Sequence, residues 1–223
     1  NVNMWEHEAT RKPLETLRKR GVKIVAPGSG YLACGMVGAG RLAEPETIVE
    51  ATLETLGGSQ DMKAETVLVT AGGTREAIDP VRFIGNRSSG KMGYALAEAA
   101  KARGAEVILV SAPTALTPPS GCAFVPVTSA AEMRAAVMEQ LPRATVVIGA
   151  AAVADFRMAE VAGEKLRRKG ALHLELEPTE DILRGVAEKR QPGTLVIAFA
   201  AEMDSDVARA REKMLGKGAD AIV

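Results

Sequence analysis

A long loop rich in glycine, serine and arginine follows a predicted buried strand, and its residue types suit the binding of an anion. The strand is expected over residues 66–70 and the loop over residues 71–89. Residues 85–92 read G-N-R-S-S-G-K-M, which satisfies G-x-x-x-x-G-K but has Met92 where a P-loop needs a hydroxyl for Mg²⁺. A P-loop also leaves its strand directly, so we reject that interpretation.

The same loop supports a simpler site, an anion held at the start of a helix. Ser88 or Ser89 is expected to cap a helix whose free N–H groups and dipole attract negative charge. Arg82, Arg87 and Lys91 lie close by in the sequence and would pair with the anion. Loops of this length inside compact domains usually carry function, so we interpret this one as part of an active site.

Small residues follow a second apolar run and predict a place where a ligand approaches the backbone. Gly149, Ala150 and Ala151 come directly after the apolar residues 146–148, and Asp155 follows shortly. At the carboxyl end of a central strand such residues admit a ligand, and Asp155 could accept hydrogen bonds from a ribose or coordinate a metal. Close packing of a helix on the sheet explains the small residues equally well.

Basic residues are concentrated in two later segments. Residues 165–169 carry four positive charges in five positions, which usually indicates a solvated surface but here suits a mobile flap that closes over a polyphosphate. Phe199 ends another predicted strand at a carboxyl edge, where ligands bind. Lys213 and Lys217 lie four residues apart on the last predicted helix, and each alone would be interpreted as an exposed lysine.

Alternating strands and helices must position these residues. Strands are expected at 66–70, 105–111, 123–127, 144–150, 172–177, 194–200 and 219–223, and helices near 89–103, 129–141, 180–190 and 204–216. Ser129 and Glu132 form a capping box. The apolar runs are too continuous for half-exposed strands, so the pattern predicts a Rossmann-like α/β domain with a mostly parallel sheet and helices on both faces.

The pattern divides the chain into a fragment at residues 1–56, a linker at 57–65 and a domain at 66–223. The fragment predicts a helix over 10–19, a strand over 22–26, a glycine-rich loop over 27–40 and a helix from Pro45. It is too short for an independent α/β domain, so we expect that its beginning is missing.

Composition excludes several classes of function. With 28 basic and 28 acidic residues and 3% aromatic residues, a nucleic-acid partner is not expected. The absence of an 18-residue apolar run predicts no membrane partner, and the lack of an export signal predicts a cytoplasmic protein. Cys34 and Cys122 match no metal or redox spacing, and His7 and His173 indicate no zinc site.

Together, these segments resemble the phosphopantothenate–cysteine ligase domain (phosphopantothenoylcysteine synthetase) of the bifunctional coenzyme A biosynthesis proteins, over nearly all of 66–223. Residues 71–82 read A-G-G-T-R-E-A-I-D-P-V-R, and Asn86 and the run S-S-G-K-M-G at 88–93 follow. Residues 151–156, 164–165 and 199–202 then match in the order of the family. The flap departs from the usual Lys-x-Lys-Lys, because Arg167 and Arg168 replace two lysines.

The resemblance implies that CTP activates the carboxylate of 4′-phosphopantothenate as an acyl-cytidylate, and that the amine of cysteine displaces CMP. Asn86 would act at the acyl group, and Mg²⁺ would share the triphosphate charge with lysines. The implied nucleotide-binding residues are Gly149, Ala150, Ala151, Asp155, Lys165, Glu177, Pro178, Thr179, Glu180, Phe199, Lys213 and Lys217, and those that bind the other substrate are Arg82, Ser88, Ser89 and Lys91. A homodimer of the ligase domain is implied, with a higher homo-oligomer in the full fusion.

Residues 1–56 resemble the end of the flavin-dependent phosphopantothenoylcysteine decarboxylase that precedes the ligase in these fusions, a flavodoxin-like α/β domain. The resemblance implies that Asn1 binds substrate and that Cys34, in the clamp G-S-G-Y-L-A-C-G at 28–35, protonates the enethiolate intermediate. The parent fusion would use FMN. Because the flavin-binding beginning is not in this chain, we expect that the fragment neither holds FMN nor decarboxylates.

Two other classes of function stay open on the residues. An NAD(P)-dependent dehydrogenase would share the alternating strands and helices, although the turn after the first strand lacks G-x-G-x-x-G. A non-catalytic nucleotide-binding module would keep the fold and the basic flap without the acyl chemistry. The residues also leave CTP and ATP undistinguished, because both carry the same triphosphate.

Overall fold

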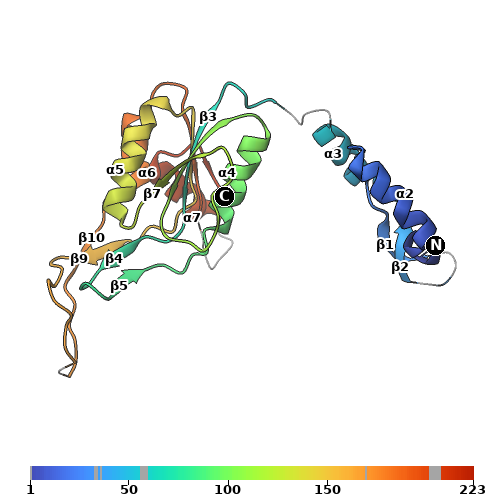
Figure 1. Cartoon of the computed structure of the whole chain (residues 1–223). Coiled ribbons are helices and arrows are strands. Elements are labelled where there is room, and N and C mark those ends of the chain that lie inside the picture. Colours follow the sequence, from blue (N-terminus) through green and yellow to red (C-terminus); the bar gives the residue numbers. More distant parts are fainter. Residues whose placement is uncertain (1, 33–34, 36, 56–59, 169, 201–206) are drawn as a thin grey trace. The chain divides into compact units, whose positions relative to one another are not determined.

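A computed structural model describes residues 2–32, 35, 37–55, 60–168, 170–200 and 207–223. The chain forms two compact units, residues 1–59 and 60–223, which are considered separately (Figure 1). Within the described residues, no helix has both the length and the apolar character that crossing a membrane would require.

The first unit contains helices and one β-hairpin. Its helices are α1 (Val2–Glu6), α2 (Glu8–Lys19) and α3 (Pro45–Thr55), and its strands are β1 (Gly28–Tyr31) and β2 (Val37–Arg41). The strands pair antiparallel, with an irregular register between Gly28 and Ser29. The helices predicted over residues 10–19 and from Pro45 are therefore confirmed.

The strand predicted at residues 22–26 is wrong. Those residues adopt no regular structure, and Val22 and Val25 are exposed. A strand needs a neighbour to satisfy its backbone groups, and none of the described strands pairs with this segment. The pairing lies instead within residues 27–40, where the glycine-rich stretch predicted as a loop forms the β1–β2 hairpin.

The second unit is built on a six-stranded sheet in the order β12-β11-β8-β3-β6-β7, and all of its neighbouring strands are parallel. The strands are β3 (Thr66–Ala71), β6 (Glu106–Ser111), β7 (Ala123–Pro126), β8 (Val146–Gly149), β11 (Leu195–Ala198) and β12 (Ala221–Ile222). The predicted parallel α/β sheet is confirmed. β3 occupies a central position because its residues, from Val67 to Ala71, are buried on both faces.

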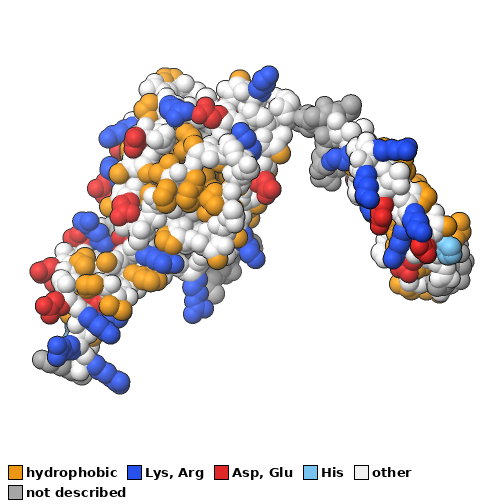
Figure 2. All heavy atoms as spheres, viewed as in Figure 1, with side chains coloured by type: hydrophobic (Ala, Val, Ile, Leu, Met, Phe, Trp, Pro, Cys, Tyr) orange, Lys and Arg blue, Asp and Glu red, His pale blue; other side chains and the backbone are white. Residues whose placement is uncertain are grey.

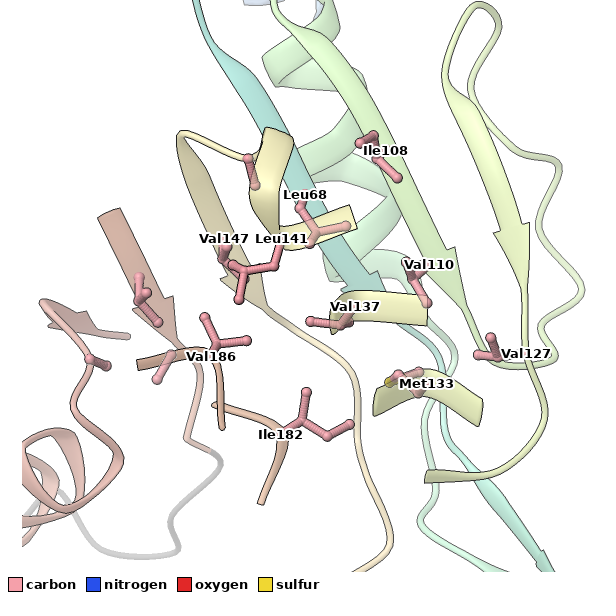
Figure 3. Packing of buried hydrophobic residues seen from close by; sticks show 14 of the residues in the cluster. Leu68, Ile108, Val110, Val127, Met133, Val137, Leu141, Val147, Ile182 and Val186 are labelled. Atoms are coloured by element: carbon pink, nitrogen blue, oxygen red, sulfur yellow. The ribbon is translucent and has the colours of Figure 1, made fainter. Parts of the chain in front are cut away.

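Helices cover both faces of this sheet, as predicted (Figure 1). On one face α4 (Lys91–Ala102) packs Tyr94, Ala97 and Ala100 against the buried strands. On the other face lie α5 (Ala130–Gln140), followed by a short 3₁₀ turn (Leu141–Arg143), α6 (Ile182–Lys189) and α7 (Val207–Lys217). Figure 3 shows Met133 and Val137 of α5 among the strand residues of this second core.

The capping box predicted at the start of α5 is confirmed in part. The Ser129 hydroxyl accepts from the Glu132 N–H at 3.2 Å, which is the first half of the motif. The Glu132 carboxylate accepts from the N–H of Thr128, at 2.7 Å, rather than from that of Ser129. The reciprocal bond therefore reaches one residue further back along the chain.

Two short hairpins extend from the carboxyl side of the sheet and alter two of the predictions. The loop at 71–89 contains β4 (Arg75–Ala77) and β5 (Phe83–Gly85), which pair antiparallel. The strand predicted at 172–177 is only β10 (Leu176–Pro178), which pairs antiparallel with β9 (Phe156–Met158) and lies outside the main sheet. Residues 159–168 and 170–175, between these two strands, form an arm that extends beyond the hairpin (Figure 1).

Candidate functional site

The order of the strands reverses between β3 and β8, and such a reversal typically opens a crevice beyond the carboxyl ends of the two strands. The chain leaves β3 through α4 toward β6 on one side, and α5 returns it to β8 on the other. In open α/β sheets, ligands bind outside the carboxyl ends of strands at such a point. Thr70 pairs with Gly149 at the strand ends, and Gly73 and Ala152 continue side by side as a parallel bridge.

Two threonine hydroxyls tie the segments beyond these strand ends together. The Thr70 hydroxyl accepts from the Ala151 N–H at 3.3 Å, and the Thr74 hydroxyl accepts from the Ala154 N–H at 2.8 Å. The Ala152 N–H donates to the Gly72 carbonyl at 2.8 Å. These bonds hold the small residues predicted to border a ligand against β3 and the loop at 71–89.

Asn86 lies against the same segment. Its Nδ2 donates to the Val153 carbonyl at 2.9 Å, across 67 positions of sequence. The loop also passes close to Gly73, because a Cβ added there would stand 2.7 Å from the Asn86 carbonyl oxygen. The structure therefore brings the predicted catalytic amide to the crevice between β3 and β8.

The cap predicted at Ser88 or Ser89 is wrong, because the N-cap of α4 is Gly90. Gly90 has φ +75°, in the left-handed region, and as a glycine it has no side chain with which to cap the helix. A Cβ at this position would stand 2.6 Å from the Thr114 Cγ2, so glycine is required both by conformation and by space. The serine hydroxyls accept instead from the N–H groups of Gly90, at 3.3 Å, and of Lys91, at 3.5 Å.

The small residue that ends β8 is explained by packing. A Cβ on Gly149 would stand 2.8 Å from the Leu183 Cδ2 of α6, so this glycine lets the helix approach the strand. Its carbonyl accepts from the Phe199 N–H at 3.3 Å, which places Phe199 beside the crevice. Ala150 and Ala151 are partly buried against the two cores, and their contact with a ligand stays a prediction.

Asp155 and the segment at 177–180 lie side by side at the far end of the crevice. The Thr179 N–H donates to the Asp155 carbonyl at 2.9 Å, and the Thr179 hydroxyl donates to the Ala154 carbonyl at 2.6 Å. Asp155 itself is exposed. Glu177 forms an ion pair with Arg157 at 2.6 Å.

Glu180 and Lys217 each face a partner of opposite charge. Arg134 of α5 lies 2.7 Å from Glu180, and Lys217 Nζ lies 3.0 Å from the Oδ2 of Asp181. Asp181 caps α6 by accepting from the Arg184 N–H. Burial raises the pKa of Asp181, but the Arg184 N–H and Lys217 outweigh it, so the pKa lies below its ordinary value. Lys217 thus reaches the segment that borders the crevice.

Lys165 lies on the arm, beside the tip of the β4–β5 hairpin. Figure 2 shows lysine and arginine side chains gathered on this part of the surface. A cavity of about 690 Å³ is lined here by residues of the arm and by Arg82, and its charged lining residues, Arg82, Lys165, Arg167 and Arg168, are all basic. The described residues therefore include a basic, anion-attracting surface on the arm.

The partly exposed guanidinium of Arg82 forms an ion pair with a buried carboxylate. Its Nη2 lies 2.5 Å from the Oδ2 of Asp79, whose side chain is fully buried while that of Arg82 is 41% exposed. The Arg82 guanidinium, aided by the N–H groups of Val81 and Leu166 and opposed by burial, holds the pKa of Asp79 far below its ordinary value. Asp79 is thus charged throughout the neutral range.

Several site predictions are not placed by this structure. Asn1 and Cys34 lie outside the described residues, as do Ala201 and Glu202 of the 199–202 motif. Lys213 lies in α7 and is exposed. Among the residues that the structure describes, no three His, Cys, Asp or Glu side chains group to hold a metal ion.

Three residues that organise the site had no role predicted from the sequence. Thr70 and Thr74 look like ordinary strand and turn residues, and no sequence signal connects them to residues 151–154. Asp79 carried a local signal, because aspartate commonly accepts from the backbone N–H two residues later in a turn. The observed bond from the Val81 N–H, at 2.8 Å, matches that pattern.

The fold is an open, parallel α/β sheet of the Rossmann-like type, and a loop that carries a side-chain amide lies beside its switch point. Residues 62–223 match the family described as "DNA/pantothenate metabolism flavoprotein C-terminal domain", and residues 1–57 match "Flavoprotein". The chain belongs to the DNA/pantothenate metabolism flavoprotein family.

Three named proteins are similar to this chain. The chain is 47% identical over 227 residues to the coenzyme A biosynthesis bifunctional protein CoaBC of Bacillus subtilis, and the match spans all of this chain but 56% of that protein. The crystal structure of a CoaBC C-terminal domain matches with a TM-score of 0.66 and 47% identity, over 74% of this chain and 79% of that one. A Cab2 mutant in complex with phosphopantothenate-cysteine shares the fold, with a TM-score of 0.63 and 20% identity over 81% of this chain and 80% of that one.

Proposed function

We propose that residues 60–223 join 4′-phosphopantothenate to cysteine at the expense of CTP, as a step of coenzyme A biosynthesis. A carboxylate oxygen of phosphopantothenate attacks the α-phosphorus of CTP, and pyrophosphate leaves. The cysteine amine then attacks the acyl carbon of the resulting acyl-cytidylate, CMP leaves with the bridging oxygen, and the amine loses a proton. A carboxylate is a poor electrophile, and the nucleotide supplies the leaving group.

The observation that carries this proposal is the position of Asn86 at the switch point. A nucleotide crevice alone suits many activities, but this one has a side-chain amide held against its wall by the Val153 carbonyl, at 2.9 Å. An amide nitrogen has two N–H donors. The bond to Val153 uses one of them and orients the group, so the second is available to the acyl oxygen.

Such a donor would act on the charge that develops when the amine attacks. The acyl oxygen becomes negative in the tetrahedral transition state, and a preoriented N–H stabilises it more than it stabilises the starting carbonyl. We therefore assign Asn86 to the transfer step. The nucleoside would lie along Ala150, Ala151, Asp155 and Phe199, beside the segment at 177–180.

The triphosphate would be neutralised by Lys165, Lys213 and Lys217 together with Mg²⁺. When bound, Mg²⁺ offsets phosphate charge, and it commonly needs only one or two protein carboxylates because phosphates and water fill its other positions. Asp155 is an exposed carboxylate at the crevice and would serve as one such ligand. The donor set is thus compatible with a metal held mainly by the nucleotide.

Replacing Lys165 by glutamine tests the role of the arm. The substitution keeps most of the side-chain length and removes the charge, so we expect a higher KM for CTP and a slower first step. Pyrophosphate release at varied CTP measures both. The Lys63→Gln variant is the control, because Lys63 is an exposed lysine in the turn at 60–64. If the CTP dependence of Lys165→Gln is unchanged, Lys165 does not bind the nucleotide and is an ordinary solvent-exposed lysine.

We also propose that the ligase domain functions as a homodimer. The two hairpins beyond the sheet expose large apolar side chains, among them Val81, Phe83 and Phe156, each more than half exposed. Exposed apolar clusters of this kind mark protein interfaces, and Figure 2 shows hydrophobic side chains on this part of the surface. Sedimentation of the wild type and of Phe83→Ser tests the assignment, and a monomeric wild type would refute it.

Flavin chemistry is not proposed for this chain. FMN carries a phosphate that needs N–H donors or basic groups. The first unit holds a cavity of about 540 Å³, and the described residues that line it, such as Trp5 and Leu42, are almost all apolar and include no charged group. These residues do not fit the phosphate of FMN, and we assign them no flavin step.

One assay separates the proposed ligase from its rivals. Purified protein is incubated with CTP, Mg²⁺, phosphopantothenate and cysteine, and pyrophosphate, CMP and the amide product are measured. We expect all three in equal amounts, and omission of phosphopantothenate should stop pyrophosphate release. Nucleotide binding without pyrophosphate would support the non-catalytic module, and oxidation of NAD(P)H would support the dehydrogenase. Substituting ATP for CTP measures the base preference.

A further inference from the structure

A buried carboxylate connects the loop that carries Asn86 to the arm that carries Lys165. Asp79 lies at the tip of the β4–β5 hairpin and is 2% exposed. Its bonding partners come from two segments that are 87 positions apart in the sequence. The two oxygens of the carboxylate divide these partners between them, so their roles can be separated.

One oxygen builds the hairpin tip. The Oδ1 of Asp79 accepts from the N–H groups of Val81 and Arg82, each at 2.8 Å. Both donors lie within three residues of Asp79, so this oxygen serves only the local turn. It would hold the turn in the same way if the other oxygen were replaced.

The other oxygen holds the arm. The Oδ2 of Asp79 accepts from the Leu166 N–H at 3.1 Å and from two nitrogens of Arg82. The Arg82 Nη2 also donates to the Leu166 carbonyl at 2.7 Å. Both backbone groups of Leu166 are thus bound by one ion pair. A further bond, from the Ala162 N–H to the Ile78 carbonyl at 3.0 Å, joins the same two segments.

We propose that Asp79 is a positioning residue that makes the hairpin and the arm one rigid element, so that Lys165 is presented together with Asn86. Lys165 is the direct neighbour of Leu166, and Asn86 lies four residues beyond Arg82. The inference rests on the proposed ligase function. Asp79 touches no substrate: it acts through Arg82 and through the backbone of Leu166.

Repulsion between like charges would make the arm mobile if nothing anchored it. Lys165, Arg167 and Arg168 repel one another in the same short segment, and no described acidic side chain lines the cavity they share. The buried carboxylate lies at the base of this basic cluster and compensates part of its charge. Without this carboxylate the arm would sample many positions, and the entropy lost on ordering the arm would weaken the binding of nucleotide.

Asp79→Asn separates the two roles of the carboxylate. The Asn oxygen can still accept from Val81 and Arg82, which preserves the turn, but its NH₂ group would face three N–H donors where Oδ2 stood. We expect faster hydrogen–deuterium exchange in residues 160–168 while the exchange of β3 and β8 stays unchanged. We also expect kcat/KM for CTP to fall by about 100-fold, the loss that a small misplacement produces.

Asp220→Asn is the matched control. Asp220 also pairs with an arginine, Arg190, and accepts from a backbone N–H, that of Val196. It lies near the amino end of β11, whereas the proposed site lies beyond the carboxyl ends of the strands. The control should lower the melting temperature while it leaves exchange in the arm and the CTP kinetics at their wild-type values. If Asp220→Asn changes the CTP kinetics as much as Asp79→Asn does, the effect is general destabilisation and the proposal fails.

A second variant guards against a fold defect at Asp79. Leu166→Pro deletes the N–H that donates to Oδ2 and leaves the hairpin residues intact. It should reproduce the faster exchange of the arm. Adding Asp79→Asn to Lys165→Gln should lower kcat/KM for CTP little further, because both substitutions act on one element. If the arm exchanges at the wild-type rate in Asp79→Asn and in Leu166→Pro, the proposed anchoring role of Asp79 is refuted. A wild type without pyrophosphate release would refute the ligase and leave the exchange result standing.

Discussion

Asn86→Ala is expected to form the acyl-cytidylate and to fail to pass it to cysteine. Removing one donor to a developing oxyanion costs about 10²–10³-fold in rate, and this loss should appear in the transfer step. The first step depends on the triphosphate contacts, which the substitution leaves in place. Quenched reactions with [α-³²P]CTP should therefore show labelled acyl-cytidylate accumulating in the variant and turning over in the wild type.

Gln140→Ala provides the comparison for loss of a side-chain amide away from the crevice, since Gln140 ends α5. It should match the wild type in both steps. Normal product formation by Asn86→Ala would remove the assigned role from this residue. Loss of the first step together with the second would instead mean that Asn86 contributes to nucleotide binding.

Gly73→Ala is expected to have the second largest effect, because it moves Asn86 without changing it. The added methyl would stand 2.7 Å from the Asn86 carbonyl oxygen, closer than carbon and oxygen tolerate, and the obstructing atom belongs to the backbone. The loop must shift by several tenths of an ångström or more. A misplacement of about 1 Å costs about 100-fold in rate when it misaligns a catalytic group, so we expect a loss of up to that size.

Gly30→Ala is the control for this substitution, because a Cβ on Gly30 meets nothing within 4 Å. Both variants should stay folded at the assay temperature, and only Gly73→Ala should lose product formation. Rapid mixing with cysteine should show that the loss lies in transfer. A Gly73→Ala enzyme with wild-type kinetics would mean that the close approach of Asn86 to Gly73 has no part in the reaction.

The centre of the sheet was predictable because its strands are apolar runs that are buried on both faces. Residues 66–70 and 146–148 could only be strands at the centre of a covered sheet, and the structure confirms both. Residues 22–26 show the limit of that rule. They are apolar except for Lys23, but a run becomes a strand only where a neighbour supplies hydrogen bonds, and sequence alone does not reveal the neighbour.

The site was predictable in its parts and not in its connections. The small residues after β8 allowed two interpretations, and only the contact with Leu183 shows that Gly149 serves helix packing. The cap at Ser88 or Ser89 was wrong because the left-handed Gly90 takes that position. The bond between Asn86 and Val153 joins residues 67 positions apart, and no local pattern encodes such a distance.

An oxygen label tests most directly whether the carboxylate is activated by transfer of a cytidylyl group. Phosphopantothenate labelled with ¹⁸O in its carboxylate is converted with CTP, Mg²⁺ and cysteine, and the products are analysed by mass spectrometry. Attack on the α-phosphorus predicts one ¹⁸O in CMP for each amide formed, and none in pyrophosphate. Unlabelled CMP, or ¹⁸O in inorganic phosphate, would contradict the acyl-cytidylate.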